Sequence, residues 1–384
     1  MALKNVIRKT AISCLTRGFA LFRKPKSVLF SSFNGKSYSD NPRAISEALH
    51  KLDPDAEIVW AFLKPAQKKS IVPEYVRMVN RSDGFAYYRE LAAAKVVVSN
   101  YSFIEPKGKG QRFLQTWHGD RAFKKILYDA NANRKQELSE SIDGFCDLAL
   151  AGSEYGVSQY RTGFRYKGEV LTVGTPRDDI LIHPEAQRIE TIRQKLGIQA
   201  ETKILLYAPT LRWVHIHGQG DQEIQDLDIK RTIQVLEEKD GSQWVCLMRA
   251  HPVMSGLFGF ETNEKILDVS GFEDMADLLL VADVLITDYS SCAGDFALTH
   301  RPIILYQSDR REYREKDRDF YFEMEDSPYM IAENQQELED WISRLDEETV
   351  RKNCDEILRF YKTTESGKAA DAAAGRIVEW LNED

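Results

Sequence analysis

The sequence has few cysteines and no recognisable metal-binding spacing, and both features argue against a structural metal site or a redox disulfide. Its five cysteines stand far apart, with no Cys-x-x-Cys pair of the kind that holds zinc or a redox disulfide. The seven histidines include no His-Glu-x-x-His signature. His215 and His217 flank a single residue in a charged segment, which is more typical of a solvated loop than of a metal site. We therefore expect a protein of a reducing cytoplasm without a structural metal.

An overall excess of positive charge is also absent, since the formal net charge is −8. A general nucleic-acid binder normally carries a basic field that neutralises phosphates, so we expect no nucleic-acid partner. The proportions of hydrophobic residues (43%) and charged residues (29%) argue against a disordered or multi-spanning membrane protein. A chain of 384 residues is about twice the usual length of one domain and predicts two domains.

Acidic residues are missing altogether from residues 1–26, where seven lysines and arginines stand. Arg8, Lys9 and Arg17 interrupt every apolar run there, which argues against a signal peptide or a transmembrane helix. Apolar residues at three- to four-residue spacing share one helical face. They are Leu3, Ile7, Ala11, Leu15, Phe19 and Phe22. The pattern predicts an amphipathic basic helix on an anionic membrane surface, the alternative being a helix that packs on the protein itself.

Short β-prone apolar segments alternate with helix-patterned or loop segments along most of the chain. This alternation predicts parallel sheets with crossover helices. A first series of strands is expected at Ser27–Ser32, Glu57–Phe62, Val96–Ser99, Phe113–Trp117, Leu148–Ala151 and Val170–Val173. A second series is expected at Ile204–Tyr207, Trp244–Met248, Ile266–Val269, Val284–Thr287 and Ile303–Tyr306. Two such series predict two Rossmann-like units.

The segment from Pro176 to Thr202 is charged and helix-forming without a strand pattern, and we place a domain boundary there. The expected division is an amphipathic helix over 1–26, a first α/β domain over 27–180 and a second over 181–384. A helix is expected over Ala44–Leu52, after a polar loop. The last helix, Ala369–Leu381, has the option of packing back on the first domain.

In open α/β sheets, ligands bind beyond the carboxyl ends of the strands. His118 and Gly119 come directly after the expected strand Phe113–Trp117. An imidazole titrates near neutral pH and is suited to removing a proton, and a glycine lets the backbone approach a ligand closely. We interpret His118 as a general base, the alternative being a loop histidine that only hydrogen-bonds its neighbours.

Polar residues that suit phosphate recognition follow two strands of the second series. Thr210 and Arg212 come after the first of these strands, and Arg249 and His251 come after the next one. A guanidinium donates charge-assisted hydrogen bonds to phosphate oxygens, and an imidazole adds a further donor. Polar capping of the strand ends is the alternative.

The segment after the expected strand Val284–Thr287 is the most specific of all. Asp288, Ser290 and Ser291 stand at the start of a helix-compatible stretch, CAGDFALTH. The backbone N–H groups and the positive dipole end of a helix start attract anions, and serine hydroxyls add donors. The segment predicts a pyrophosphate site that needs no metal ion, whereas a plain N-cap is the alternative.

Four blocks of the sequence resemble the CDP-glycerol glycerophosphotransferases of wall teichoic acid and capsule synthesis. They are SFNGKSYSDNPRAI, QTWHGD with the following FKKI, YAPTLRW through RAHP, and the long block ITDYSSCAGDFALTHRPIILYQSDRREYREKDRDFYFE. GTPRDD resembles the family's segment between domains. The resemblance spans roughly residues 27–365 and implies a GT-B-like fold, in which two Rossmann-like domains face a cleft. The first would receive the acceptor and the second would hold CDP-glycerol.

The resemblance also implies roles for single residues. His118 matches the histidine regarded as the base, and His251 matches a second histidine at the pyrophosphate. Thr287, Ser290 and Ser291 match the phosphate-binding block. The other implied substrate-binding residues lie in the matching motifs, namely Thr210, Arg212, Arg249 and Asp288.

The histidine motif departs from the family pattern. Asp120 and Arg121 stand where typical members have Thr and Pro, and RAHP replaces the more familiar RPHP. A carboxylate beside His118 favours imidazolium and is expected to raise the pKa of the base. The departure leaves the acceptor and the transferred polyol open.

The resemblance implies transfer of glycerol phosphate from CDP-glycerol to a hydroxyl of an acceptor linked to a membrane lipid, for instance undecaprenyl diphosphate, with release of CMP. The implied place is the cytoplasmic face of the membrane, where the chain is peripheral. No cofactor and no essential metal are expected, because no acidic cluster is evident. The alternatives are a ribitol-phosphate or other polyol-phosphate transferase, a GT-B nucleotide-sugar glycosyltransferase, and an inactive membrane-associated binding protein. The chain length favours priming or short extension over polymerisation.

Overall fold

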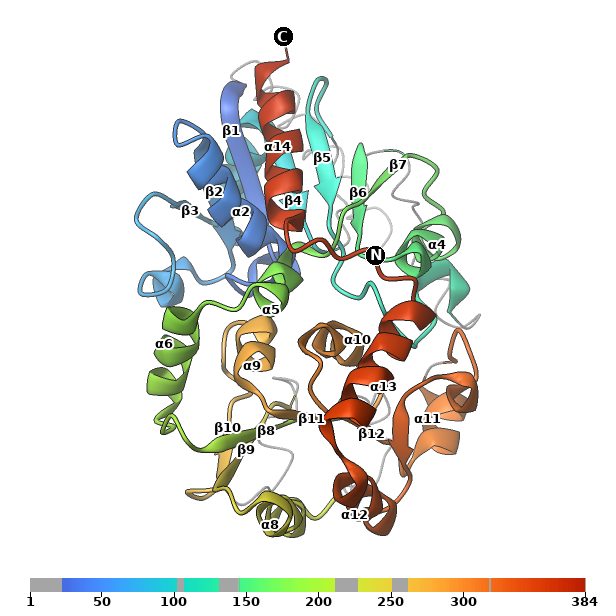
Figure 1. The fold of residues 1–384 in the computed structure, drawn as a ribbon. Helices are drawn as coiled ribbons and strands as arrows, with labels where there is room; N and C mark the ends of the chain where they lie inside the picture. Colours follow the sequence, from blue (N-terminus) through green and yellow to red (C-terminus); the bar gives the residue numbers. More distant parts are fainter. Residues whose placement is uncertain are drawn as a thin grey trace. The chain divides into compact units, whose positions relative to one another are not determined.

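The chain folds into two α/β units, each built on a parallel sheet (Figure 1). The computed structural model describes residues 23–101, 107–130, 144, 146–210, 227–250, 262–317 and 319–383. Unit 1 takes its described residues from Met1–Asp120, Glu140–Asp179 and Thr364–Asp384, and unit 2 takes them from Arg121–Ser139 and Ile180–Thr363. The expected fold class, with two Rossmann-like units, is confirmed.

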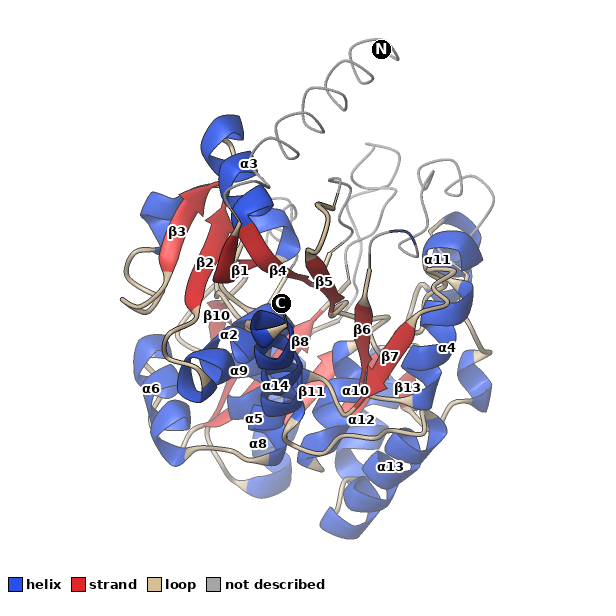
Figure 2. Cartoon of the chain, turned by 90° about the horizontal axis from the view of Figure 1, so that it is seen from above, coloured by secondary structure: helices blue, strands red, loops and turns tan. Residues whose placement is uncertain are grey.

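Unit 1 contains a seven-stranded sheet in the order β3-β2-β1-β4-β5-β6-β7, and Figure 2 shows the first five of these strands in that order. Every pair of neighbours runs parallel. The strands are β1 (Lys24–Ser31), β2 (Glu57–Phe62), β3 (Arg77–Asn80), β4 (Ala94–Ser99), β5 (Arg112–Gln115), β6 (Leu148–Ala151) and β7 (Glu169–Thr172). All six strands expected in the first series are present, and β3 was not expected because this edge strand is short and carries few apolar residues.

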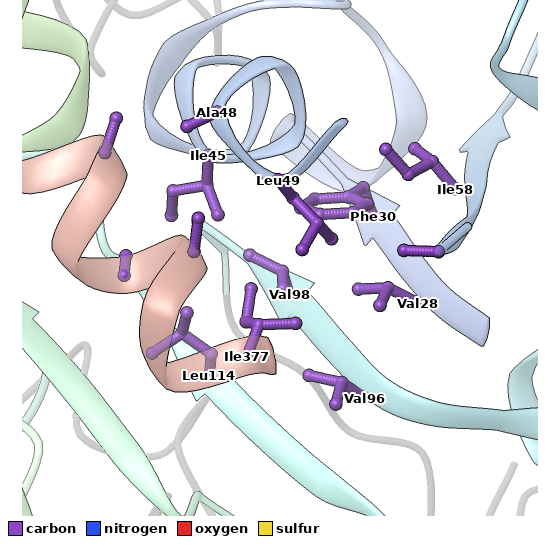
Figure 3. Close-up of a cluster of buried hydrophobic side chains, with 14 of the residues drawn as sticks. Val28, Phe30, Ile45, Ala48, Leu49, Ile58, Val96, Val98, Leu114 and Ile377 are labelled. Atoms are coloured by element: carbon purple, nitrogen blue, oxygen red, sulfur yellow. The ribbon is translucent and has the colours of Figure 1, made fainter. Parts of the chain in front are cut away.

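Two helices, α2 (Asp40–Leu52) and α14 (Ala369–Asn382), cover one face of this sheet. Apolar residues of α2 recur at helical spacing and face apolar residues that alternate along the strands. Figure 3 shows the resulting core, in which α2 and α14 meet strands β1, β2, β4 and β5. The buried side chains labelled there are Val28, Phe30, Ile45, Ala48, Leu49, Ile58, Val96, Val98, Leu114 and Ile377.

The C-terminal helix α14 is part of unit 1, although unit 2 precedes it in the chain. The carboxylate of Asp179 accepts hydrogen bonds from the backbone N–H groups of Ala369 (3.0 Å) and Ala370 (2.8 Å). The carboxylate of Glu365 likewise accepts from the N–H of Thr175 at 2.7 Å. The GTPRDD segment therefore holds the start of α14 by satisfying donors that a helix start leaves open.

Unit 2 contains a six-stranded parallel sheet in the order β10-β9-β8-β11-β12-β13. The strands are β8 (Lys203–Ala208), β9 (Trp244–Met248), β10 (Ile266–Asp268), β11 (Val284–Thr287), β12 (Ile303–Tyr306) and β13 (Met330–Ala332). All five strands expected in the second series are present, and the three-residue edge strand β13 was not expected. Helices α8 (Ile229–Asp240) and α12 (Gln335–Arg344) close a core on one face of the sheet.

The remaining described α-helices are divided between the two units. In unit 1 they are α3 (Gly84–Ala93) and α4 (Glu154–Thr162). In unit 2 they are α6 (Ala186–Leu196), α9 (Met275–Val281), α10 (Cys292–Phe296), α11 (Arg310–Lys316) and α13 (Glu347–Phe360), and the short α5 (Asp179–Ile182) begins where the chain leaves unit 1.

One segment departs from the expected domain division, because the residues that follow His118 group with unit 2 from Arg121 onward. Lys124 forms an antiparallel bridge with Phe320, and the N–H of Lys125 donates to the carbonyl of Asp319 at 2.9 Å. The N–H of Tyr321 donates to the carbonyl of Phe123 at 2.9 Å. This backbone pairing joins the segment to unit 2. From the sequence, the segment was expected in the first domain.

The basic start of the chain also needs a correction. Residues 1–22 lie outside the described part, but the expected helix cannot extend to residue 26, because Lys24 and Lys26 lie in strand β1. Their ammonium groups lie 2.8 Å from the carboxylates of Glu57 and Asp53, respectively. Two of the seven charges are therefore opposed. Among the described helices, none is long and apolar enough to cross a membrane.

Candidate active site

His118 stands in the loop after β5, and its imidazole is held in one tautomer. Its Nδ1 atom lies 2.7 Å from the carbonyl oxygen of Asn100, which directly follows the neighbouring strand β4. A carbonyl oxygen accepts but cannot donate, so Nδ1 carries the proton of the neutral ring. The lone pair then lies on Nε2, which is the state that a general base requires.

Asn100 is a buried polar residue that sequence reasoning missed. Its Oδ1 accepts a hydrogen bond from the N–H of Phe33 (2.8 Å), and its Nδ2 donates to Ser32 Oγ (3.1 Å) and Asp40 Oδ1 (3.0 Å). Asn100 itself is fully buried, with 0% of its surface exposed. Asn100 therefore ties the loops after β1 and β4 together and presents its own carbonyl to His118. A polar residue immediately after an apolar strand was the available signal, and it is the same signal that identified His118.

Several non-glycine residues around this loop have left-handed backbone angles, among them Phe33, Asp40 and Trp117. The φ angles are 45° at Phe33, 64° at Asp40 and 50° at Trp117. Such conformations are costly for residues with side chains and persist only where the surroundings enforce them. Here the N–H of Phe33 is held by Asn100, and the N–H of Trp117 donates to Gln115 Oε1 at 2.9 Å. Strain of this kind is often concentrated at functional sites.

Aromatic rings frame the imidazole of His118. Its ring centroid lies 4.2 Å from that of Trp117, 5.3 Å from that of Phe33 and 6.0 Å from that of Tyr101. The imidazole itself is half-buried, and Tyr101 is exposed. The arrangement restricts the ring without burying it completely.

Asn41 connects the His118 loop to helix α2. Its Nδ2 donates to the carbonyls of Thr116 (3.2 Å) and Trp117 (3.0 Å), and its Oδ1 accepts from the N–H of Arg177 at 3.0 Å. The matching blocks SDNPRAI, QTWHGD and GTPRDD therefore meet at one place in unit 1. In this chain, the side chain of Asn41 joins the three blocks by hydrogen bonds.

The two residues that depart from the family pattern are both buried and both bonded. The carboxylate of Asp120 accepts from the N–H of Gly152 (2.9 Å) and the hydroxyl of Ser153 (2.6 Å), at the start of α4. Arg121 Nη2 donates to Asp295 Oδ1 in α10 at 2.7 Å. These partners give Asp120 and Arg121 an anchoring role. The expected effect of Asp120 on the pKa of His118 stays a prediction.

In unit 2, the predicted binding residues cluster at the carboxyl ends of three neighbouring strands, β8, β11 and β9. The carboxylate of Asp288 accepts from the N–H of Thr210 at 2.9 and 3.0 Å, so the residues after β8 and β11 are joined directly. The hydroxyl of Thr287 donates to the carbonyl of Ala208 at 2.6 Å. The bond of Thr287 is buried, that of Asp288 is partly buried, and both support the strand ends. Contacts of Thr210, Thr287 and Asp288 with a substrate remain predictions.

The helix start predicted after β11 is present as α10, with Ser291 as its N-cap residue. Ser290 and Ser291 are partly exposed, in contrast to the buried Thr287 and Asp288 before them. Ser290 Oγ accepts from the N–H of Cys292 at a long 3.4 Å. The two serines thus present hydroxyls at the first turn of a helix, where an anion is favoured. Their role as phosphate ligands remains a prediction.

Arg249 directly follows strand β9, and Cys292 of α10 is among the groups that act on its pKa. Its Nη1 donates to the carbonyls of Val269 (3.3 Å) and Phe272 (2.7 Å). Burial lowers the pKa of Arg249, while the carboxylate of Asp274 acts in the opposite direction. A guanidinium nevertheless stays protonated in proteins, so a positive charge is kept near the first turn of α10.

Two of the predicted site residues, Arg212 and His251, lie outside the described residues. The structure brings together Thr210, Arg249, Thr287, Asp288, Ser290 and Ser291 at the sheet edge of unit 2. His118 belongs to unit 1. Across the described ranges, no group of three or more His, Cys, Asp or Glu side chains is placed to hold a metal ion.

Comparisons with known proteins agree on one family. A family model described as CDP-Glycerol:Poly(glycerophosphate) glycerophosphotransferase matches residues 14–379. The teichoic acid glycerol-phosphate transferase of Staphylococcus aureus is 30% identical over 96% of this chain and 97% of its own length. The teichoic acid poly(glycerol phosphate) polymerase of Bacillus subtilis is 31% identical over 84% of this chain and 44% of its own length. The chain spans about half the length of this polymerase.

A solved structure is similar over nearly the whole chain. It is the wall teichoic acid polymerase TagF, in a variant soaked with CDPG, with a TM-score of 0.81 and 26% sequence identity. The similarity covers 99% of this chain and 97% of that one.

Proposed function

Because the chain belongs to the CDP-glycerol:poly(glycerophosphate) glycerophosphotransferase family, we propose that it transfers glycerol phosphate from CDP-glycerol to an acceptor hydroxyl. The observation that carries this proposal is the 2.7 Å contact between His118 Nδ1 and the carbonyl of Asn100. That contact leaves Nε2 as the basic nitrogen, as proton removal from a hydroxyl requires. The similar polymerase structure soaked with CDPG supports the class of donor.

On the acceptor side, His118 Nε2 takes the proton of the acceptor hydroxyl. The hydroxyl oxygen forms a bond to the β-phosphorus of CDP-glycerol, and the bond between that phosphorus and the bridging oxygen breaks. The bridging oxygen leaves with CMP, and the product is a phosphodiester. Catalysis of phosphoryl transfer depends mainly on positioning and on charge stabilisation, and the hydrogen bonds of Asn100 supply the positioning of the base.

On the donor side, the positive charge of Arg249 and the first turn of α10 stabilise the charge that builds on the phosphates. Ser290 and Ser291 add hydroxyl donors. His251 and Arg212 are proposed to complete this site, in line with their place in the matching motifs. Preorganised donors of this kind are usually the largest single contribution to such a reaction.

The acceptor is proposed to be linked to a membrane lipid, with undecaprenyl diphosphate as one suitable carrier, and the chain is proposed to act as a peripheral protein at the cytoplasmic face of the membrane. The relatives named above act in teichoic acid synthesis, which supports a polyol-phosphate polymer as the product. The basic, apolar pattern of residues 1–22 supports the membrane contact. No resident metal is proposed, and unchanged turnover after dialysis against EDTA is the expected result.

A panel of donors tests the proposed activity. Purified chain is incubated with a lipid-linked acceptor and with CDP-glycerol, CDP-ribitol or a nucleotide sugar, and the products are identified by mass spectrometry. CMP release and an acceptor enlarged by glycerol phosphate are expected with CDP-glycerol. Preferred turnover of CDP-ribitol would change the polyol, and turnover of the nucleotide sugar alone would make the chain a glycosyltransferase. Binding without any turnover would make it a binding protein.

A further inference from the structure

Consecutive side chains after His118 are anchored in different units. Asp120 belongs to unit 1, where its carboxylate is bonded to Gly152 and Ser153. Arg121 belongs to unit 2, where its guanidinium is bonded to Asp295 of α10. The chain therefore crosses from one unit to the other at the peptide bond that joins them, two residues after His118.

Both anchors are buried ionic groups. The exposed fraction is 8% for Asp120, 0% for Arg121 and 3% for Asp295. Burying charge is costly unless each group is paired and hydrogen-bonded. A buried ion pair is for this reason weak evidence of stability, and it is better explained by a need for a defined position.

Glycines make room for each anchor. A Cβ atom at Gly156 would collide with the carboxylate of Asp120. A Cβ atom at Gly294 would lie 2.6 Å from Cβ of Arg121. Each side chain is thus fitted to a glycine of the helix on which it is anchored, Gly156 in α4 and Gly294 in α10.

The anchors act on the loop that carries His118. On the preceding side, the loop is held by Gln115, Asn41 and Asn100, all in unit 1. After His118, the chain reaches Arg121 in three residues. It is then held by the backbone hydrogen bonds of Phe123 and Lys125 described above. A displacement of about 1 Å in a reacting group is enough to cost about 100-fold in rate.

We propose that Asp120 and Arg121 are positioning residues that form a clasp on the His118 loop, Asp120 by its bonds to the start of α4 and Arg121 by its ion pair with Asp295. The clasp rests on the proposed role of His118 as base. Within unit 2, Arg121 is bonded to the same helix, α10, that has Ser290 and Ser291 at its start.

Two sets of variants remove the interactions of Asp120 and Arg121 that form the clasp. Asp120→Asn keeps the shape of the side chain and removes its charge. Arg121→Met combined with Asp295→Leu replaces the buried ion pair by apolar side chains, an exchange that proteins often tolerate without loss of stability. The matched control is Arg188→Met with Asp277→Leu, which removes another ion pair of unit 2, with a 2.6 Å separation, between α6 and α9.

The expected result is a fall in kcat of about 10- to 100-fold for each set, with CDP affinity changed less than twofold. The triple variant is expected to lose no more than the worse of the two sets, because both act on one loop. The control pair is expected to keep its kcat. Unchanged kcat in both sets, or losses that multiply in the triple variant, would overturn the clasp.

Hydrogen exchange of the peptide spanning residues 113–123 gives a readout that does not depend on turnover. Faster exchange is expected in both sets of variants and not in the control pair. Unchanged exchange in Asp120→Asn overturns the clasp even where the apolar pair fails to fold. An unaltered chain that releases no CMP from CDP-glycerol overturns the proposed function, whereas the exchange rates still decide whether the two residues hold the loop.

Discussion

The carbonyl oxygen of Asn100 lies 2.7 Å from Nδ1 of His118, and this contact sets which nitrogen of the imidazole is basic. Asn100 can do so because its own side chain is bonded to Ser32, Phe33 and Asp40. The base is therefore oriented by a residue that precedes it by 18 positions and follows a neighbouring strand.

Asn100→Ala tests this orientation. The substitution keeps the carbonyl but removes three side-chain hydrogen bonds, so the loop and the imidazole lose their fixed geometry. We expect kcat to fall by about 10- to 100-fold, with CDP affinity by calorimetry unchanged. Asn382→Ala, at an exposed position of α14, is the control and should behave like the unaltered chain. Full activity of Asn100→Ala would show that the carbonyl is held without the side chain.

Substitution of Thr287 is expected to change stability, whereas substitution of Ser290 and Ser291 is expected to change CDP affinity. Thr287→Val leaves the buried carbonyl of Ala208 without its donor, so the free energy of unfolding should fall by about 1–3 kcal/mol while CDP affinity changes little. Ser290→Ala with Ser291→Ala should weaken CDP binding, with little change in urea-induced unfolding. If Thr287→Val weakened CDP binding and the double serine variant did not, the phosphate contact would be assigned to Thr287.

Burial raises the pKa of the thiols of Cys146, Cys246, Cys292 and Cys354 to about 12. Only a thiolate reacts with iodoacetamide, so at pH 8 these thiols should be alkylated in urea but not in the native protein. Since an unfolded thiol loses its proton near pH 8.5, their contribution to stability is complete below that pH and decreases as the pH rises toward 12. Mass spectrometry of a Cys14→Ser variant is the measurement. Rapid native labelling of Cys292 would contradict the packing at α10.

Removal of residues 1–22 tests the proposed membrane contact. Strand β1 begins at Lys24, so the truncated chain should fold and keep its CDP affinity. Its binding to anionic vesicles should fall, and its activity on a lipid-linked acceptor should fall more than its activity on a soluble analogue. Higher salt should weaken the binding of the full chain only in part.

Neutral vesicles are the control for the charge contribution in that experiment. Equal vesicle binding before and after truncation would refute the membrane contact. Insolubility of the truncated chain would instead favour the alternative, in which this segment packs on the protein itself.

The strands were predictable because each is a continuous apolar segment bounded by polar residues, as in Val284–Thr287 and Leu148–Ala151, whose limits match the structure. The edge strand Arg77–Asn80 was not, because only its two central residues are apolar, and Met330–Ala332 is a run of only three residues. His118 could be found from its place after a strand.

The residues that hold the His118 loop in place could not be predicted in the same way. The bonds of Asn100 and the pairing of Arg121 with Asp295 join residues that the sequence separates widely. From the sequence, Lys24 and Lys26 were assigned to a basic helix, because their partners, Glu57 and Asp53, belong to a later part of the chain. In each case the deciding contact is tertiary.

His118→Ala gives the most direct test of the proposed transfer. CMP release from CDP-glycerol in the presence of a lipid-linked acceptor is measured for the unaltered chain and the variant, together with the CDP-glycerol dissociation constant of each. The account predicts that the unaltered chain adds glycerol phosphate to the acceptor, and that the variant loses about 10²- to 10⁴-fold in rate while binding CDP-glycerol as before. A His118→Ala chain that still transfers glycerol phosphate at the rate of the unaltered chain would contradict it.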